Sequence, residues 1–253
     1  WGLIQLTQQI HPLLGIMVEV ILLASCFAGK SLRKAAQSVL NPLNQGEIEE
    51  ARTKLGQFVG RDTEQLSVED ILRATLESVA ENTIDGVTSP LFYAILGAFF
   101  FPIGSIPLAI AYKAASTLDS MIGYLREPYT DIGWFSAKFE DYLTYLPCRL
   151  TVFTLACLSG KPQQVLAICR RDAPQDMSLN SGWSECVYAA ILGVQLGGMN
   201  SYQGVPKFKP LLGNPDHPIT SNTVEKAFTL TRQCFLLWLV IAIGGLFVKN
   251  LLF

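Results

Sequence analysis

The chain has 253 residues, of which 50% are apolar and only 16% are charged, and its formal net charge is −2. Soluble domains carry about 25% charged residues, so this composition favours a membrane protein over the alternative, a soluble helical bundle with an unusually apolar core. The near-neutral charge excludes the basic surface that nucleic-acid binding requires, and two histidines are too few for a histidine-rich metal centre. The six cysteines show no C-x-x-C spacing, which indicates small buried residues and not a disulfide framework.

The first predicted membrane span covers residues 13–28 and is interrupted by Glu19. A helix needs about 20 largely apolar residues to cross a bilayer. Lys30, Arg33 and Lys34 follow this segment closely, and such a basic cluster favours the cytoplasmic side of the membrane for that end.

Residues 31–88 form the most polar segment, and we predict mainly cytosolic helices there. An amphipathic helix is expected over 47–58 because its apolar residues recur at helical spacing. Ser67 and Asp70 have the spacing of a capping box, which predicts the start of a second helix that continues to about Asp85.

Three acidic residues of this second helix, Glu77, Glu81 and Asp85, are spaced at i, i+4 and i+8 and are expected on one face. Like charges at this spacing destabilise an isolated helix by roughly 0.2–0.5 kcal/mol per pair. A sequence selected only for stability would alternate the signs of charge there. The stripe therefore indicates a binding site for a divalent cation or a cationic substrate.

A further apolar segment covers 90–112 but is broken by Pro102 and Gly104, which predicts either a kinked span or two half-helices. Two weaker span candidates lie at 146–158 and 187–196. Both are shorter than a bilayer-crossing helix.

Polar residues gather directly after the 90–112 segment. Lys113, Thr117, Ser120 and Tyr124 fall on one helical stripe, and Asp119 lies on the stripe beside it. Charged side chains at the end of a hydrophobic span are costly unless they are paired or line a wet cavity. Snorkelling to water is the simpler explanation for the lysine alone, but it does not explain the whole set, so we predict a site.

Three other places of interest follow, two of them marked by an arginine and one by an asparagine. Arg61 and Asp62 lie in a glycine turn before a helix, and arginine there suits bidentate binding of phosphate or carboxylate; a surface turn in which the two residues pair with each other is equally compatible. Arg149 offers a second cation, or a membrane-edge anchor. Asn180 lies in a polar turn that could approach a ligand, although turn chemistry alone selects the same residue type.

Residues 199–224 are rich in Gly, Pro and Asn and predict a long loop, followed by the last transmembrane helix at 232–249. Strand-like alternation of apolar and polar residues persists nowhere. The predicted fold is therefore all-α: one membrane-embedded domain over 1–253, a polytopic helical integral membrane protein whose cytosolic helices and loops carry the site.

Five motifs follow one another along the chain: Gly-Arg-Asp-Thr at 60–63, Glu-Ser-Val-Ala-Glu-Asn with a following Asp-Gly at 77–86, Tyr-Lys-Ala-x-x-Thr-Leu-Asp-Ser-Met-x-Gly-Tyr at 112–124, Pro-x-Arg at 147–149 and Asn-x-Gly-Trp at 180–183. Taken together they resemble the adenosylcobinamide-phosphate synthase family of membrane proteins in cobalamin biosynthesis. The resemblance runs from about residue 1 to residue 204. Family members usually begin with another hydrophobic segment, which we expect to be missing before Trp1.

The resemblance implies an ATP-dependent carbon–nitrogen ligase that requires Mg²⁺. Its substrates would be adenosylcobyric acid, through its free propionate carboxylate, and aminopropanol or its O-phosphate, and its product adenosylcobinamide phosphate. The implied location is the bacterial inner membrane, with several spans, a site that faces the cytosol, and the lipid bilayer and other corrinoid-pathway enzymes as partners.

The motif positions imply roles for individual residues. Catalytic roles fall on Glu77, Glu81, Asp85, Lys113 and Asp119, and the first three are the expected Mg²⁺ ligands. Substrate or phosphate binding falls on Arg61, Asp62, Asn82, Thr117, Ser120, Tyr124, Arg126, Asp141, Arg149 and Asn180.

A membrane transporter or permease is the main alternative, because intramembrane acids beside broken helices also mark transport pathways. A transporter places its charges in the middle of a span, whereas these motifs flank the 90–112 segment. That arrangement favours a site at one face of the membrane.

Overall fold

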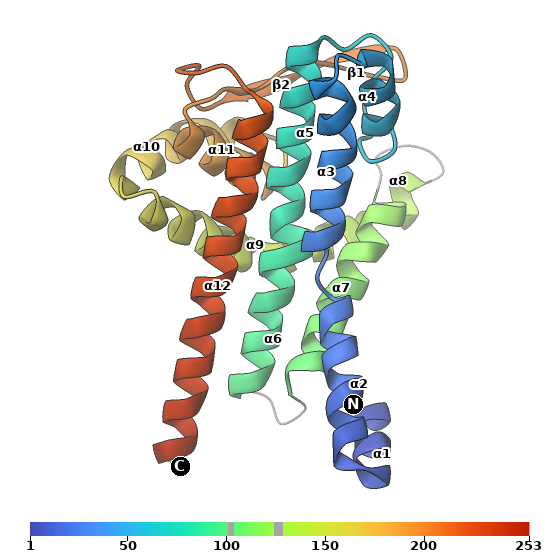
Figure 1. Cartoon of the computed structure of the whole chain (residues 1–253), viewed down its shortest axis with the longest axis vertical. Helices are drawn as coiled ribbons and strands as arrows, with labels where there is room; N and C mark the ends of the chain where they lie inside the picture. Colours follow the sequence, from blue (N-terminus) through green and yellow to red (C-terminus); the bar gives the residue numbers. More distant parts are fainter. Residues whose placement is uncertain (101–103, 124–128, 253) are drawn as a thin grey trace. The chain divides into compact units, whose positions relative to one another are not determined.

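The structure is a computed structural model, and it describes residues 1–100, 104–123 and 129–252 (Figure 1). The described chain is mainly helical and divides into two compact units. The first unit comprises 1–28, 85–147 and 235–253, and the second comprises 29–84 and 148–234. Each unit contains segments that are distant in sequence, so no single cut in the chain separates them; the assignment of 1–253 to one domain stays a prediction.

The regular secondary structure among the described residues of the first unit is entirely helical. It contains α1 (Gly2–Ile10), α2 (Pro12–Ser25), the π-helical turn η1 (Ile84–Thr88, from Asp85), α6 (Ser89–Phe100), α7 (Ser105–Ile122), α8 (Tyr129–Ile132), the first part of α9 (Trp134–Leu158) and the last part of α12 (Ser221–Leu252). Cys26, Ala94 and Ala109 form a small buried core with Leu23 packed against it. Their small side chains allow the backbones of α2, α6 and α7 to approach closely.

The second unit combines helices with one β-hairpin. It contains α3 (Gly29–Asn44), α4 (Ile48–Leu55), α5 (Val68–Thr83), α10 (Pro162–Asp172), the short 3₁₀ turn η2 (Ala173–Gln175), α11 (Ser181–Leu192), and strands β1 (Leu196–Tyr202) and β2 (Val205–Leu212). Its apolar core is made by Val39, Ala51, Leu55, Ile71 and Ala74, which come from α3, α4 and α5. The amphipathic helix that the sequence predicts over 47–58 is therefore confirmed as the core helix α4.

Helix α5 begins where the capping residues predict. The Ser67 hydroxyl accepts a hydrogen bond from the Asp70 amide at 3.1 Å and donates one to the Asp70 carboxylate at 2.7 Å. Its end differs from the prediction, because α5 ends at Thr83 and the chain continues as the π-helical turn η1. A π turn holds more residues than an α turn, so Asp85 does not keep the i+8 position that one regular helix would give it.

The long loop predicted over 199–224 is wrong in its first half. Strands β1 and β2 pair antiparallel, with Met199 opposite Phe208 and Tyr202 opposite Val205. A bulge at Gly197 disturbs the pairing, and its φ of +87° and the 2.0 Å between an added Cβ and the Pro210 carbonyl oxygen both require glycine. Such a bulged, Gly- and Pro-containing hairpin lacks the alternation by which strands are recognised in a sequence.

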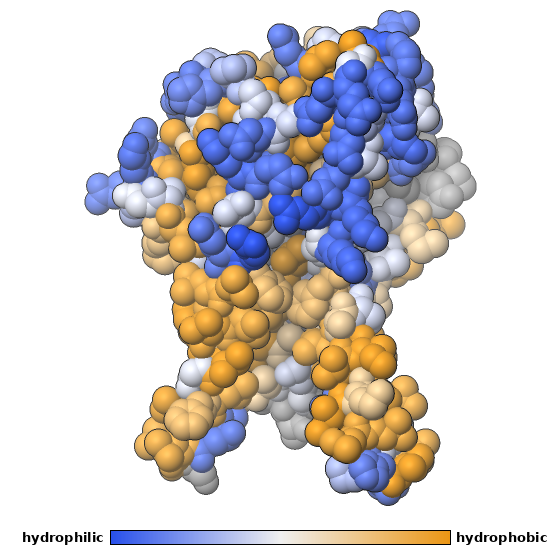
Figure 2. Space-filling view, in the orientation of Figure 1, coloured by the Kyte–Doolittle hydropathy of each residue, from blue (hydrophilic) through white to orange (hydrophobic). Residues whose placement is uncertain are grey.

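Two stretches have the length and composition of membrane-spanning helices: Pro12–Asn44, which includes α2, and Ser221–Leu252, which is α12. They contain the spans predicted at 13–28 and 232–249. Apolar side chains such as Val240 and Phe247 lie exposed on α12, and Figure 2 shows hydrophobic residues over its C-terminal part and over α2, but hydrophilic ones over α3 and α4.

The remaining predicted spans have other structures. The 90–112 segment is divided into α6 and α7, as the alternative of two half-helices predicts, with Gly104 at the start of α7 in a left-handed conformation (φ 84°). The candidate at 187–196 is wrong as a span, since α11 contributes Val187, Tyr188 and Ala189 to the buried interior of the second unit.

Gly86 permits a close approach within the first unit. Its carbonyl oxygen accepts a hydrogen bond from the Ala28 amide at 2.7 Å, and an added Cβ would lie 2.8 Å from the Ala28 Cβ. Gly86→Ala is expected to destabilise the protein by about 1–3 kcal/mol, because a well-packed site does not accommodate an extra methyl group without backbone shifts. Thermal unfolding of the purified protein measures this change.

Gly60→Ala is the matched control, because Gly60 lacks neighbours within 4 Å of an added Cβ and its φ does not require glycine. Equal unfolding temperatures for the two variants would contradict the packing argument.

Candidate functional site

A cavity of about 250 Å³ lies within the second unit, and most of its lining is polar. Glu77, Ser78, Glu81 and Asn82 come from one face of α5, where residues four positions apart are neighbours. The remaining polar residues come from the loop before α5, from α11 and from the hairpin: Arg61, Glu185, Tyr202 and Lys209. The cavity therefore includes Glu77 and Glu81 of the predicted acidic stripe.

Glu77 anchors the hairpin to α5. Its side chain is only 2% exposed; Oε2 lies 2.5 Å from the Arg61 guanidinium, and Oε1 lies 3.6 Å from Arg73 and accepts a hydrogen bond from the Gly197 amide at 2.8 Å. Arg61 also donates to Asn200 at 2.8 Å, and Arg73 donates to the Gly197 carbonyl. Both carboxylate oxygens of Glu77 thus have cationic or amide partners.

Glu185 and Lys209 form a second buried ion pair. The Lys209 ammonium lies 2.5 Å from Oε1 of Glu185, whose side chain is fully buried. The second oxygen, Oε2, has no hydrogen-bond partner among the described residues. Burial acts to lower the pKa of Lys209, but the carboxylates of Glu185, Glu81 and Glu77 outweigh that effect and raise it, so the lysine stays protonated.

Glu81 differs from the other two glutamates because it makes no hydrogen bond or ion pair within the described parts of the chain. Its side chain keeps access to solvent at the cavity. The surrounding protein nevertheless displaces water and raises the pKa of Glu81; Asp176 and Glu77 act in the same direction, and Lys209 and Arg61 oppose them. Burial also raises the pKa of Glu185, but that side chain is fully buried. Glu81 is the cavity carboxylate that combines a raised pKa with access to solvent.

Asp62 has a structural role beside the cavity. Its carboxylate accepts hydrogen bonds from the Ser201 hydroxyl at 2.6 Å and from the amides of Gln203 and Gly204 at 2.9 and 2.8 Å, which holds the hairpin turn. The Ser201 hydrogen bond, followed by that of Gly204, lowers the pKa of Asp62. Arg61 and Asp62 thus each bind distant partners and do not pair with each other as a surface turn. Phosphate binding by either residue stays a prediction.

Arg149 and Asn180 meet elsewhere in the second unit. Arg149 donates hydrogen bonds to the Asn180 side chain at 3.2 Å and to the Leu179 carbonyl at 2.9 Å, and its guanidinium lies 4.7 Å from the centre of the Trp183 ring. A stacked, hydrogen-bonded guanidinium holds this turn in place. Neither residue lines the cavity described above. The prediction that they bind substrate therefore gains no support from this cavity and stays a prediction.

The other predicted site residues that the structure describes belong to the first unit. Asp85 lies in η1, Lys113, Thr117, Asp119 and Ser120 lie on α7, and Asp141 lies on α9, where it pairs with Lys138 at 3.4 Å. Tyr124 and Arg126 lie outside the described residues. A buried polar cluster joins α7 to α9: the hydroxyl of Tyr112, the first residue of the third motif, donates to Glu140 at 3.2 Å and lies 2.8 Å from the Thr144 hydroxyl. The sequence did not predict this pairing.

Within the part of the chain that the structure describes, no group of three or more His, Cys, Asp or Glu side chains could hold a metal ion. Glu77 already has Arg61 and Arg73 as ionic partners. Asp85 belongs to the first unit, in the π-helical turn η1, whereas Glu77 and Glu81 belong to the second. The predicted Mg²⁺ ligands and the Mg²⁺ requirement stay predictions.

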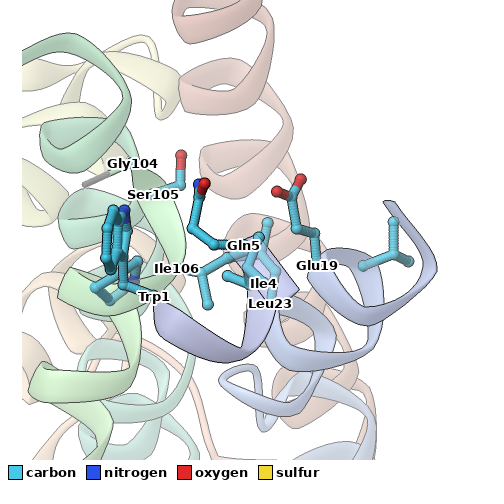
Figure 3. A pocket seen from close by; sticks show the side chains of 10 residues that line it. Trp1, Ile4, Gln5, Glu19, Leu23, Gly104, Ser105 and Ile106 are labelled. Carbon is cyan, nitrogen blue, oxygen red and sulfur yellow. The ribbon is translucent and has the colours of Figure 1, made fainter. Parts of the chain in front are cut away.

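A second cavity, of about 410 Å³, lies within the first unit among α1, α2 and the start of α7 (Figure 3). Its polar groups include Gln5, Glu19 and Ser105, and Glu19 accepts a hydrogen bond from Gln8 at 2.9 Å. It contains none of the residues that the sequence motifs identify, and we do not assign the reaction to it.

Sequence reasoning missed Glu185, Tyr202 and Lys209 as cavity residues. A signal was present for Glu185, since a single acid within the otherwise apolar α11 is costly unless it has a partner. No comparable signal marked Lys209, because the hairpin that places it was expected to be a loop.

The fold and the cavity define a mainly helical protein with two helices of membrane-spanning length and a small ionic cavity in one of its two units. Residues 1–231 match the family model described as CobD/Cbib protein. The chain therefore belongs to the CobD/CbiB family of cobalamin biosynthesis proteins, which is the family that its motifs resemble.

Individual relatives agree with this assignment. The chain is 61% identical to a cobalamin biosynthesis protein CobD of Synechocystis over 96% of the chain and 71% of the relative. It is 42% identical to a CobD of Halalkalibacterium halodurans, over 94% and 74% of the two chains, and 44% identical to a cobalamin biosynthesis protein CbiB of Salmonella arizonae, over 91% and 71%. No solved structure matches the chain.

Proposed function

We propose that the protein is an ATP-dependent amide ligase that joins (R)-1-amino-2-propanol O-phosphate, or the free amino alcohol, to the propionate carboxylate of adenosylcobyric acid. The product is adenosylcobinamide phosphate. Membership of a cobalamin biosynthesis family supports the pathway. The observation that carries the reaction type is the cavity in which Glu81 has no ion-pair partner among the described residues, while desolvation, followed by Asp176 and Glu77, raises its pKa.

Amide formation from a carboxylate requires that an oxygen first become a good leaving group. ATP supplies this by transferring its terminal phosphoryl group to the propionate, which gives an acyl phosphate and ADP. The neutral amine then attacks the acyl carbon, the carbon–oxygen bond to phosphate breaks, and the extra proton of the ammonium leaves. A carboxylate with a raised pKa is suited to accept that proton, which is the role we give to Glu81.

The surrounding ion pairs position this carboxylate. Arg61 and Glu77 hold the hairpin against α5, and the hairpin brings Lys209 to the cavity. Because these groups have fixed partners, the charges around Glu81 need little rearrangement when the substrate binds.

We place the enzyme in the bacterial inner membrane, with several spans and a cytosolic site, in contact with lipid and with other enzymes of the corrinoid pathway. The two membrane-length helices and the exposed apolar side chains of α12 support a membrane location. The cavity is lined by α5, α11, the hairpin and the loop before α5, none of which is one of these two helices. That lining favours a ligase over a transport pathway.

Purified protein supplied with adenosylcobyric acid, the amino alcohol phosphate and Mg-ATP tests the proposal. We expect formation of adenosylcobinamide phosphate, identified by its mass, together with one ADP for each amide formed. Omission of the amine should abolish the amide product. ADP release without any corrinoid product, under conditions in which the protein is folded, would contradict the proposed reaction.

A further inference from the structure

We infer that the cavity of the second unit is a subsite for one primary ammonium group, with Glu81 and Glu185 as its acceptors. The inference rests on the proposed function for the identity of the amine, but the subsite itself follows from charge, hydrogen bonding and size. It also assigns a specificity-determining role to Glu185, which no motif in the sequence indicates.

The charges that line the cavity do not balance. Its two cations, Arg61 and Lys209, are paired with Glu77 and Glu185 at 2.5 Å each. The third carboxylate, that of Glu81, has no cationic partner among the described residues. A single positive charge therefore neutralises the lining, and a cation bound there would have the solvent-accessible carboxylate of Glu81 as its partner.

The hydrogen bonds of Glu185 indicate which chemical group supplies the positive charge. Glu185 is fully buried, and its Oε2 is left without a donor while Lys209 occupies Oε1. A buried carboxylate oxygen without a donor is costly. Glu81 and Glu185 line the same cavity, and one ammonium group has three N–H donors, so we assign a single ammonium group to both carboxylates.

The size and the cations of the cavity restrict the rest of the ligand. A volume of about 250 Å³ lies below the roughly 300–1,000 Å³ typical of sites for drug-sized ligands, so a corrin ring or a nucleotide does not fit. Both cations already have carboxylate partners, which leaves the lining without a cation for a phosphate. The ammonium end of the amine therefore enters the cavity, and any phosphate on the same molecule stays outside it.

Titration calorimetry of the full chain with 1-amino-2-propanol, and separately with its O-phosphate, tests the inference without ATP or corrinoid. Glu81→Gln carries the test, because Glu81 makes no hydrogen bond within the described residues and its replacement should leave the fold intact. We expect this variant to bind both ligands at least tenfold more weakly. Glu185→Gln should weaken binding similarly, and Glu69→Gln, an exposed position on the same helix, should leave it unchanged.

The outcomes separate this inference from the proposed function. Amine binding that depends on Glu81, without amide formation in the complete reaction, would support the subsite and overturn the ligase. Amide formation by the unmodified protein, with unchanged amine affinity in Glu81→Gln and Glu185→Gln, would support the ligase and overturn the subsite. If neither amine binds, the ammonium subsite is overturned. It is also overturned if Mg²⁺ alone binds saturably and Glu81→Gln abolishes that binding.

Discussion

Glu77→Ala is expected to destabilise the protein by about 3–5 kcal/mol, the usual cost of removing one partner from a buried ion pair. The side chains of Glu77, Arg61 and Arg73 are 2%, 8% and 13% exposed. Without the carboxylate, two guanidinium groups remain close together and the Gly197 amide loses its acceptor. Because a typical domain is stable by only about 5–15 kcal/mol, thermal or denaturant unfolding should detect the change readily.

Two further variants sharpen this prediction. Glu69→Gln, on the exposed face of the same helix, should change stability by less than about 0.5 kcal/mol. The double variant Arg61→Met with Glu77→Met should be less destabilised than Glu77→Ala, since it removes both members of the buried pair while Arg73 keeps its ion pair with Asp70 at 2.7 Å. An unfolding midpoint for Glu77→Ala equal to that of the unmodified protein would show that the hairpin is held by other contacts.

Glu81→Gln is expected to lower the rate of amide formation by about 100-fold or more, the usual contribution of a positioned general base. Its stability should remain close to that of the unmodified protein, because Glu81 makes no hydrogen bond or ion pair with any residue that the structure describes. Measurement of kcat/KM for the amine, together with an unfolding curve, separates the two effects. Unchanged turnover would remove Glu81 from the reaction.

The pH dependence of the rate follows from the same residue. The pKa of Glu81 is raised above its ordinary value of 4.5 by desolvation and by Asp176 and Glu77, against the opposing effect of Lys209 and Arg61. The protonated form cannot accept another proton, so kcat/KM should fall as the pH is lowered through this raised pKa. Glu81→Gln should lack that acidic limb.

Features that depend on neighbouring residues could be predicted from the sequence. The start of α5 follows from Ser67 and Asp70, and the break between α6 and α7 follows from the proline and glycine in the apolar segment. The acidic stripe also pointed to α5, whose Glu77 and Glu81 line the cavity, because unfavourable like charges are visible without a structure.

Features that depend on distant residues could not be predicted. The hairpin is held by contacts from Asp62 to Ser201 and Gly204 and from Arg73 to Gly197, which join residues more than 120 positions apart. A single sequence contains no local pattern for such pairs. The prediction that Arg61 offers its charge to a ligand missed its partner for the same reason, since Glu77 and Asn200 meet it only in the folded unit.

The hairpin also imposes an order on biosynthesis. The acids of α5 leave the ribosome well over 100 residues before Lys209, the cation that faces Glu185. A nascent chain that ends before β2 therefore holds an excess of negative charge in this region and lacks one wall of the pocket. The cavity of the second unit can be completed only after translation has passed residue 209. A chain truncated just before that residue should therefore be recognised by quality-control proteases.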